Sequence, residues 1–390
     1  MRILMTGATG LLGPEIGKKL VERGHQVSVI SRSASKAKEK LPFPCEIIEG
    51  DLLQTSPRRE ALAHIEGVIH LMGEPVMGRR WTEEKKKQIY NSRILGTRHL
   101  VESLPSSLQV FVSASAIGYY GDCGDEVVTE ERTVGADFLA KVCRDWEAEA
   151  QKAPGRTVCI RTGLVLSDQG GALQQMLPPF RAGLGGVLGS GQQWMSWIHR
   201  DDITQLFLTA IESERMQGAV NGVSPQPVTN RDFSQALASA LGTSLGPAVP
   251  LAALRVLFGD AAEVVVSSLR GSSAKAEQAG LFFKFPDLSE ALHNLCQPWR
   301  EGQEEFKEEY YIESTPDKVE LVLDAQETQH KGLTAQHVTE VLPLGSGTLV
   351  REKLHYPSTR WPWLAVLKSP LRKKEAEAFF VSRRRIFPKV

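Results

Sequence analysis

The sequence predicts an α/β fold: a doubly wound parallel sheet with a smaller lobe beside it and an additional C-terminal α+β segment. Three observations lead to this prediction. A short apolar run meets three evenly spaced glycines at the start of the chain, in RILMTGATGLLGPEIGKKL. Strand-like and helix-like patterns then alternate as far as residue 167, and after that point the chain becomes rich in glycine and proline. Such alternation is typical of parallel sheets covered by helices, which bind ligands at the carboxyl ends of their strands.

The composition limits the class of protein. The chain has 390 residues, 42% of them apolar, which is enough for two domains. Lys plus Arg and Asp plus Glu both total 46, so no net charge favours nucleic acid or an acidic membrane surface. The five cysteines are far apart, which argues against a disulfide framework or a zinc cluster and suits a reducing compartment. Without an apolar run long enough to cross a bilayer or a signal peptide before the first strand, we expect a cytoplasmic protein.

The opening stretch predicts a strand, a glycine turn, a helix and a second strand. Leu12, Ile16 and Leu20 recur at four-residue spacing and mark the buried face of the helix, so that Lys18 is expected to face solvent. The segment QVSVIS then begins the second strand. The glycines therefore stand at the first strand-to-helix turn of the sheet.

The glycine turn predicts a seat for a pyrophosphate. Gly7, Gly10 and Gly13 are spaced G-x-x-G-x-x-G at a helix N-terminus, where unpaired N–H groups and the helix dipole favour an anion. Glycines let the backbone approach the phosphates and let the helix pack closely on the strand. The alternative is a chance glycine pattern in a loop, but the strand before it and the helix after it favour the phosphate site.

The end of the second strand indicates which dinucleotide is bound. An NAD-binding chain would carry an acidic residue here for the ribose 2′-hydroxyl, whereas this chain has Ser31 and Arg32. A guanidinium and a hydroxyl suit a 2′-phosphate. We therefore expect NADP (NADPH) as the cofactor, the alternative being that Arg32 is a solvated surface residue.

The remaining elements follow in order. The segments CEIIEGDL, GVIHLMGE, VFVSASAIGYYG and RTVCIRTGLVLS predict the third to sixth strands, and Thr82 predicts the cap of an intervening helix. After residue 168, glycines and prolines accumulate, which predicts long ordered loops in place of regular elements.

Several motifs resemble one family closely. TGATGLLG is similar to the nucleotide-binding turn of extended short-chain dehydrogenases/reductases. Together with GEPVMGRRW, SASAIGYYGD, LPPFRAGLGGVLGSGQQWMSWIHRDD and NGVSPQPVTN, it resembles the atypical group labelled epimerase family proteins, which are NAD-dependent epimerase/dehydratase-like. The resemblance covers residues 1–297 and implies a Rossmann-type NADP-binding domain whose substrate lobe lies mainly in 168–200 and 222–297. Residues 298–390 lie outside it.

The turn and the resemblance together imply a set of cofactor-binding residues along the carboxyl edge of the sheet. We expect them to be Gly7, Thr9, Gly10, Leu11, Leu12, Gly13, Ser31, Arg32, Asp51, Leu52, Leu71, Met72, Gly73, Glu74, Arg93 and Arg161.

The resemblance also implies a catalytic group, from which this chain departs. Extended members use a Ser or Thr with a Y-x-x-x-K pair, in which the Lys ammonium favours the Tyr anion. Ser115 and Lys141 match the Ser and Lys positions, but Asp137 stands where the Tyr is expected. A surface Asp–Lys pair explains those two residues equally well. Tyr119 and Tyr120 are the nearby phenols that remain as proton donors, or they are packing residues of a loop.

The substrate pocket is expected to be less polar than that of a sugar-nucleotide enzyme. Where those enzymes carry an R-D-[FY] tripeptide whose Arg binds a diphosphate, this chain has Met195, Ser196 and Trp197. Arg181 is either a second anion-binding group or a solvated loop residue.

The C-terminal segment predicts further strands and a helix. Six glutamates between Glu301 and Glu313 indicate a solvated junction. Residues 319–323, HVTEVL and TLVREKLHY alternate like strands, and residues 363–385 form a basic helical pattern. This faintly resembles the end of helix-grip lipid- or polyketide-binding domains, although a basic solvated helix face is the more ordinary interpretation.

These expectations lead to two hypotheses of function. The first is an NADP(H)-dependent oxidoreductase or epimerase-like enzyme, without the usual Tyr, acting on a small hydroxyl or carbonyl substrate. The alternative is a non-catalytic NADPH-binding sensor or interaction protein that has the phosphate turn and lacks the proton relay. A lipid-handling role of the C-terminal segment is a third possibility. The sequence predicts neither the substrate nor the oligomeric state.

Overall fold

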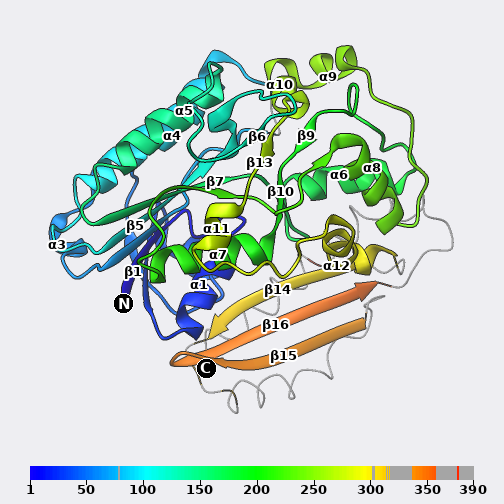
Figure 1. Ribbon diagram of the computed structural model, residues 1–390. Helices are drawn as coiled ribbons and strands as arrows, with labels where there is room; N and C mark the ends of the chain where they lie inside the picture. The colour runs from blue at the N-terminus through cyan, green and yellow to red at the C-terminus, as the bar shows by residue number, and fades with distance from the viewer. Residues whose placement is uncertain are drawn as a thin grey trace.

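The computed structural model describes residues 1–77, 80–300, 304–312, 314, 316, 336–356 and 376, and the structural statements below concern these residues. Its main sheet has seven parallel strands in the order β11-β7-β5-β4-β1-β2-β3 (Figure 1). They are β1 (Arg2–Thr6), β2 (Gln26–Ser31), β3 (Glu46–Glu49), β4 (Gly67–His70), β5 (Val110–Ala116), β7 (Arg156–Thr162) and β11 (Gly218–Gly222). This arrangement confirms the predicted doubly wound sheet, and the strand order reverses between β1 and β4, where ligands bind in such folds.

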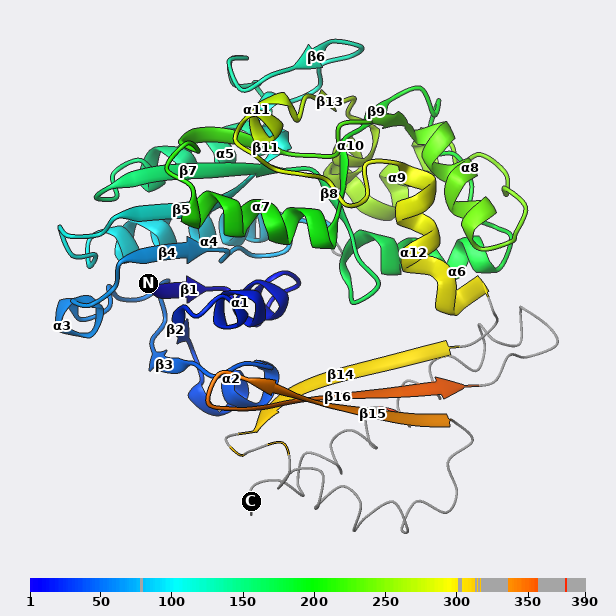
Figure 2. The same ribbon diagram turned by 60° about the horizontal axis from the view of Figure 1, so that its bottom comes forward.

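Helices cover both faces of the sheet. On one face α1 (Gly13–Glu22) packs against α7 (Arg200–Glu212), and on the other α4 (Glu83–Val101) packs against α5 (Phe138–Ala150) (Figure 2). Two shorter helices, α2 (Ala34–Lys40) and α3 (Arg59–Leu62), follow β2 and β3. All four residues of β4 are buried, as expected for a strand that is covered on both sides. Thr82 caps α4, as predicted, by accepting a hydrogen bond from the N–H of Lys85.

The smaller lobe is more regular than the sequence predicted. Its helices and short strands are α6 (Gly171–Arg181), α8 (Asn230–Ala240), α9 (Leu251–Phe258), α10 (Ala262–Val266), α11 (Ala274–Gln278), α12 (Leu288–Arg300), η2 (Gly259–Ala261), β8 (Leu164–Leu166) with β10 (Trp197–His199), β9 (Trp194–Met195) with β12 (Val228–Thr229), and β13 (Arg270–Gly271) with β6 (Val127–Val128). The prediction of long loops after residue 168 was therefore wrong for α6. The helix was hidden because Pro178 and Pro179 lie inside it.

The predicted sixth strand is two strands. It divides at Gly163 into β7 of the main sheet and β8 of the lobe. A side chain at Gly163 would overlap the carbonyl oxygen of Ser196, so this glycine lets the lobe approach closely where the chain leaves the sheet.

The C-terminal segment forms a three-stranded antiparallel sheet in the order β14-β16-β15, from β14 (Glu304–Ile312), β15 (Gln336–Leu344) and β16 (Gly347–Tyr356). The strands predicted at HVTEVL and TLVREKLHY are confirmed. The glutamate-rich junction was a wrong interpretation for residues 304–312, which form β14. The predicted strand at 319–323 lies outside the described residues, and so does the predicted helix at 363–385 apart from Ala376.

This second sheet packs against the first part of the chain (Figures 1 and 2). Leu344 and Leu349 belong to the same buried cluster as Ile16 of α1. Lys18, predicted to face solvent, is only 4% exposed because β14 covers it. Its ammonium lies 2.7 Å from Glu15 and 3.0 Å from Glu309. The prediction failed because β14 lies almost 300 residues further along the chain.

Candidate functional site

The glycine turn between β1 and α1 lies at the reversal of strand order. Gly7 has a positive φ of 67°, and a Cβ there would lie 2.8 Å from the carbonyl carbon of Leu71. A Cβ at Gly13 would overlap the backbone of Ala8. These two glycines therefore allow the close packing of the turn against β4 and of α1 against the turn.

Gly10 is different, because its outer side is open. A Cβ there would meet only the carbonyl oxygen of Gly7, at 3.1 Å. Thr9, Gly10 and Leu11 are exposed, and α1 begins at Leu12 without a side-chain cap for its first N–H groups. Uncapped N–H groups beside an open glycine are the arrangement that a pyrophosphate requires. The turn fits a dinucleotide phosphate in this respect.

The smaller lobe lies close to the glycine turn. A Cβ at Gly170 or Gly171 would lie 3.1 Å or 3.0 Å from a methyl group of Leu11. Leu12 is half-buried beside it and joins the main core. The exposed edge of the turn therefore faces the first residues of α6.

Ser31 and Arg32 stand at the end of β2, next to the turn. Arg32 is exposed, and the structure gives its guanidinium no hydrogen bond or ion pair within the described residues. Ser31 bonds locally, donating to the carbonyl of Ser33 at 3.2 Å. After β3, Asp51 accepts from the N–H of Leu53, whereas Leu52 is 2% exposed and packs in the core. Arg32 is thus the charged group at this edge that is free to bind an anion.

The loop after β4 packs against α4, which supports it. The Met72 side chain fills the space over Gly96, and Gly73 lies over the guanidinium of Arg93. Arg93 donates to the carbonyl of Glu74 at 3.0 Å, and the Glu74 carboxylate lies 2.5 Å from the ammonium of Lys85. Leu71 is half-buried at the start of this loop. Arg93 therefore supports the backbone of residues 71–74 in this structure.

A buried histidine beneath the turn was missed by the sequence analysis. His70 is fully buried, and its ring nitrogens lie 2.6 Å from the hydroxyl of Thr6 and 2.9 Å from that of Thr97. Burial lowers the pKa of His70 to about 3, so the ring is neutral. It connects β1, β4 and α4 behind the site. Its only signal in the sequence is a polar residue at the end of an apolar strand.

The candidate catalytic residues belong to a buried network at the ends of β5 and β7. Ser115 donates to Glu147 at 2.7 Å, and Arg161 binds the same carboxylate with two bonds of 2.8 Å. Arg161 also donates to the hydroxyl of Tyr120 at 2.9 Å, which in turn donates to Asn221 at 2.7 Å. Glu147 and Asn221 were not predicted, since nothing in the local sequence separates them from surface residues.

Tyr120 and Tyr119 differ sharply in this network. Burial raises the pKa of Tyr120 to about 12, although Arg161 opposes the shift, and the hydroxyl has two protein partners. Tyr119 is half-buried, and the guanidinium of Arg161 lies 3.5 Å from the centre of its ring. A phenol that is bound on both sides and has a raised pKa is a poor general acid or base. Tyr119 is the better placed of the two.

Lys141 is not part of this network. It is exposed on α5, whereas Asp137 caps that helix by accepting from the N–H of Ala140 at 2.8 Å. The position of the family Tyr therefore has a structural use here. The structure brings Ser115, Tyr119 and Tyr120 to Glu147 and Arg161 instead of to Lys141.

Two residues of the tripeptide at residues 195–197 are buried in the lobe. Trp197 is fully buried in the core of the lobe, with its indole N–H donating to the carbonyl of Gln226 at 2.9 Å. The hydroxyl of Ser196 bridges Leu269 and Gly271. Trp197 and Ser196 thus hold the lobe together, whereas Met195 is half-buried, and the less polar pocket stays a prediction.

Comparisons with known proteins agree with this geometry. A model of the NAD dependent epimerase/dehydratase family matches residues 3–221, and one described only as a domain of unknown function matches residues 249–295. An Arabidopsis thaliana epimerase family protein SDR39U1 homolog, named as chloroplastic, is 38% identical over 76% of this chain and 87% of its own length. The human epimerase family protein SDR39U1 is 32% identical over 76% of this chain and 99% of its own length.

Solved structures show the same likeness. The crystal structure of human SDR39U1 (isoform2) with NADPH superposes with a TM-score of 0.67 at 30% identity, over 76% of this chain and 99% of that one. A UDP-glucuronic acid 4-epimerase from Bacillus cereus with NAD has a TM-score of 0.61 at 18% identity, over 76% of this chain and 99% of that one, which concerns the fold alone. Within the described residues, no helix is both long and apolar enough to cross a membrane.

Proposed function

Because the chain belongs to the NAD dependent epimerase/dehydratase family, we propose that it is an NADP(H)-dependent oxidoreductase or epimerase-like enzyme acting on a small hydroxyl or carbonyl compound. The observation that carries the cofactor part is Arg32, an exposed guanidinium with no partner among the described residues, beside an open, uncapped glycine turn. The human relative crystallised with NADPH supports the same choice.

The cofactor would be held along the carboxyl edge of the sheet. The N–H groups of Leu11 and Leu12 would bind the pyrophosphate, and Ser31 with Arg32 would bind the 2′-phosphate. The N–H of Gly10 donates to the carbonyl of Gly7 at 2.9 Å and holds the turn. Asp51 and Leu52 would lie near the adenine, and the backbone at 71–74 would line the nucleotide. When bound, the nicotinamide supplies or accepts a hydride. Arg93 and Arg161 would act by supporting these walls, because their donors are bound to protein groups.

The proton would move through Tyr119 in this proposal. Its ring rests on Arg161, and Arg161 is held in place by Glu147. Ser115 would orient the substrate oxygen only after releasing its hydrogen bond to Glu147. Lys141 keeps the family's role at the nicotinamide ribose as a prediction, which requires its exposed side chain to turn toward the bound cofactor.

The second candidate function is a non-catalytic NADPH-binding sensor or interaction protein. One observation favours it: the hydroxyls of Ser115 and Tyr120 are both bound inside the protein, and Asp137 is used as a helix cap. The two candidates share the cofactor and differ in turnover.

Turnover with a panel of hydroxyl and carbonyl compounds, followed by NADPH absorbance, tests the proposal. An enzyme should oxidise or reduce at least one compound, and Tyr119→Phe should slow it by about 10²–10⁴-fold, the usual effect of removing a general acid or base. Tyr120→Phe and Asp137→Asn should retain turnover in their folded fractions. A chain that binds NADPH tightly and turns over none of the panel supports the sensor instead.

We also propose a domain boundary near residue 297. The curated relatives match almost end to end while covering about three quarters of this chain, which supports a self-sufficient first domain. A chain of residues 1–297 should bind NADPH and unfold more easily than the full chain, because it loses the packing of Leu344 and Leu349. Insoluble material would place the boundary elsewhere. The free cysteines support a reducing compartment such as the cytoplasm.

A further inference from the structure

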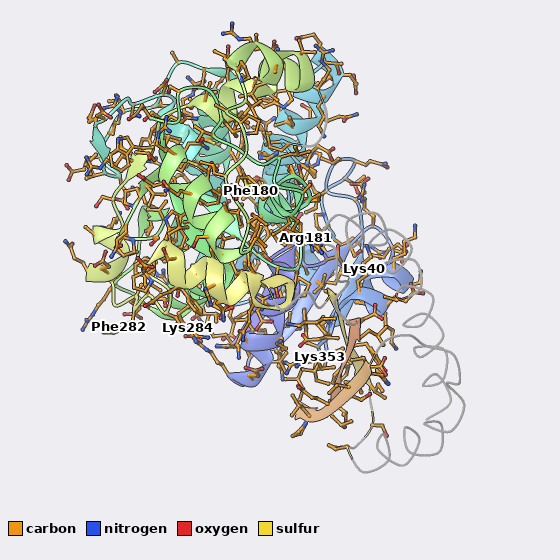
Figure 3. All side chains as sticks on the ribbon, turned by 90° about the vertical axis from the view of Figure 1, so that its right-hand side faces the viewer. Lys40, Phe180, Arg181, Phe282, Lys284 and Lys353 are labelled. Atoms are coloured by element: carbon orange, nitrogen blue, oxygen red, sulfur yellow. The ribbon has the colours of Figure 1, made fainter. Side chains whose placement is uncertain are left out.

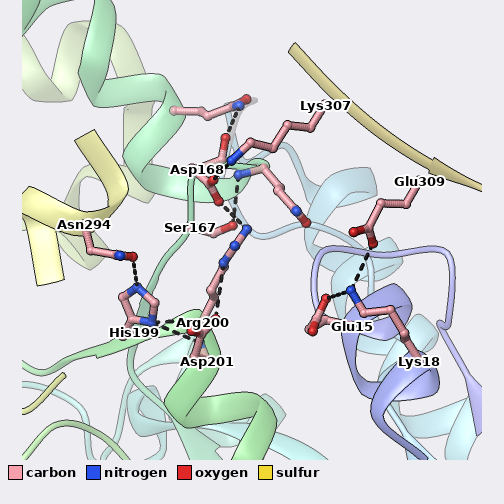
Figure 4. A network of polar contacts seen from close by, with 12 residues as sticks. Glu15, Lys18, Ser167, Asp168, His199, Arg200, Asp201, Asn294, Lys307 and Glu309 are labelled. Atoms are coloured by element: carbon pink, nitrogen blue, oxygen red, sulfur yellow. Dashed lines mark hydrogen bonds and ion pairs between the residues drawn. The ribbon is translucent and has the colours of Figure 1, made fainter. Parts of the chain in front are cut away.

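A cleft lies beside α1. It has a volume of about 500 Å³ and opens between α1, the start of α7 and strands β14 and β16, with none of residues 7–12 in its lining. Figure 4 shows the polar groups around it, with Lys307 and Glu309 on the strand facing Arg200 and Lys18. The volume is in the range that accommodates a small-molecule ligand.

The lining of this cleft has an excess of positive charge. It contains seven cationic side chains and four carboxylates. One of these carboxylates, Asp202, is already used by the backbone, because it accepts from the N–H groups of Lys284 and Phe285 at 2.7 Å and 3.1 Å. The cleft therefore favours an anion.

The floor of the cleft is a compact ion network. Lys18 lies between Glu15 and Glu309, and Arg351 reaches Glu309 at 2.5 Å. Arg200 is paired with Asp168. These groups are largely buried and hold α1, α7 and the second sheet together, so we treat them as the structural base of the site.

The rim of the cleft carries four lysines, each with a carboxylate near its ammonium group. Lys19 and Lys284 are 42% and 67% exposed in their ion pairs with Glu22 and Asp201. Lys307 lies 3.8 Å from Asp168, and Lys353 lies 2.9 Å from Glu340, which is outside the lining. Exposed ion pairs such as those of Lys19 and Lys284 contribute little free energy, so a ligand can compete for these two lysines.

Two features of the rim point to the chemistry of the ligand. Lys307 and Lys353 are direct partners on β14 and β16, so two positive charges lie side by side at the rim, with Asp168 and Glu340 as their carboxylate neighbours. Phe282 lines the same cleft while 89% exposed, which is unusual for a phenylalanine (Figure 3). An exposed ring beside ammonium groups suits a planar ring that bears phosphates.

We propose that this cleft is a second ligand site, which binds an organic polyphosphate with an aromatic base. The rim lysines bind the phosphates, and Phe282 stacks on the base. The lining of this site contains none of residues 7–12 of the cofactor turn, and it depends on β14 and β16, which lie outside residues 3–221 and 249–295 that the family models match.

Calorimetric titration of the full chain tests this site, with ATP and inorganic pyrophosphate as probes and one equivalent of NADPH present to fill the cofactor turn. Both probes should bind, ATP more tightly. Lys307→Ala/Lys353→Ala and Lys19→Ala/Lys284→Ala should each raise Kd at least tenfold for both probes. Phe282→Ala should weaken ATP alone. The control is Lys40→Ala/Lys87→Ala, which removes two exposed lysines away from the cleft and should bind like the wild type.

The Lys19→Ala/Lys284→Ala variant changes two exposed side chains and should fold. It therefore still tests the site if the Lys307→Ala/Lys353→Ala variant fails to fold. Absence of binding by either probe overturns the proposal, as does wild-type binding by the rim variants. Equal loss of ATP and pyrophosphate in Phe282→Ala overturns the stacking role.

Discussion

The glycine turn and the Ser115 network both lie at the carboxyl edge of one sheet, but their polar groups are used in opposite ways. At the turn, α1 starts without a side-chain cap, Gly10 faces open space, and Arg32 has no partner in the part of the chain that the structure describes. At Ser115, the hydroxyl, the Glu147 carboxylate and the Arg161 guanidinium bind one another. A group that is already bound inside the protein must give up those bonds to reach a ligand, and that costs free energy.

This comparison distinguishes the glycine turn, which keeps the binding features expected of the family, from the Ser115 network, which departs from them. The turn has the open shape and unused donors of a binding site, whereas the network has the satisfied bonds of a structural core. Tyr119 belongs fully to neither region. The guanidinium of Arg161 lies over its ring, whereas the hydroxyl of the neighbouring Tyr120 is hydrogen-bonded inside the protein. We therefore expect NADPH binding to depend on the glycine turn and folding stability to depend on the Ser115 network.

The largest effect is expected at Gly10. Gly10→Val places a branched side chain where we propose that the pyrophosphate binds, which should reduce NADPH affinity by more than about 1,000-fold, or 4 kcal/mol. The fold should remain, because a Cβ at this position meets only one backbone oxygen at 3.1 Å. Calorimetry and circular dichroism measure the two properties.

Gly13→Ala is the matched control within the same turn. Its Cβ would overlap the backbone of Ala8, so it should destabilise the fold as an overpacked site does, by about 1–3 kcal/mol. If Gly10→Val binds NADPH normally, the phosphates lie elsewhere and the comparison of the two regions fails.

The next effect is expected at Glu147. Glu147→Gln leaves the buried Arg161 without its counter-charge, which should lower the free energy of unfolding by about 3–5 kcal/mol. NADPH affinity of the folded protein should change little. Denaturant titration measures the loss of stability.

Glu149→Gln on the same helix is the control, because its partners Arg98 and Lys152 are exposed. It should cost less than about 1 kcal/mol. Equal losses for the two variants would show that the Ser115 network is not a special contributor to folding.

A smaller effect is expected from acid. Burial lowers the pKa of His70 to about 3 and that of His199 to about 4 from the ordinary 6.5. Between its folded-state pKa and 6.5, each histidine is protonated in the unfolded chain but not in the folded chain. The free energy of unfolding therefore falls as pH decreases below about 6.5. Each histidine should cost about 1.4 kcal/mol per pH unit there.

Denaturant titrations at pH 7 and pH 5 check this slope, and His70→Gln should reduce it by about half. The same unfolding free energy at both pH values would contradict the buried, neutral state of His70 beneath the turn.

The parts of the molecule that depend on local pattern could be predicted from the sequence. The parallel sheet followed from the alternation of strand and helix patterns, and the turn from the three glycines. The Thr82 cap and the strands β15 and β16 had equally local signals. Lys18 and Glu309 could not be paired in this way, because they are far apart in the sequence and one looked solvated.

The candidate site shows the same limit. Arg32 could be predicted as a cofactor residue because the position after the second strand bears on the choice of dinucleotide, and this role stays a prediction. Glu147 and Asn221 were not recognised, because a buried charge network depends on where α5 and β11 meet Arg161 in space. Asp137 looked like a lost tyrosine, and only the start of α5 gives it a role as a helix cap.

The most direct test of the account is the affinity of the wild-type chain and of Arg32→Asp for NADPH and NADH, measured by calorimetry. We predict that the wild type binds NADPH at least tenfold more tightly than NADH. Arg32→Asp should lose about 1–3 kcal/mol of NADPH binding and much less of NADH binding, because only NADPH has the 2′-phosphate. Equal affinities in the wild type, or equal losses in the variant, would contradict the claim that the open edge of this sheet is an NADPH site.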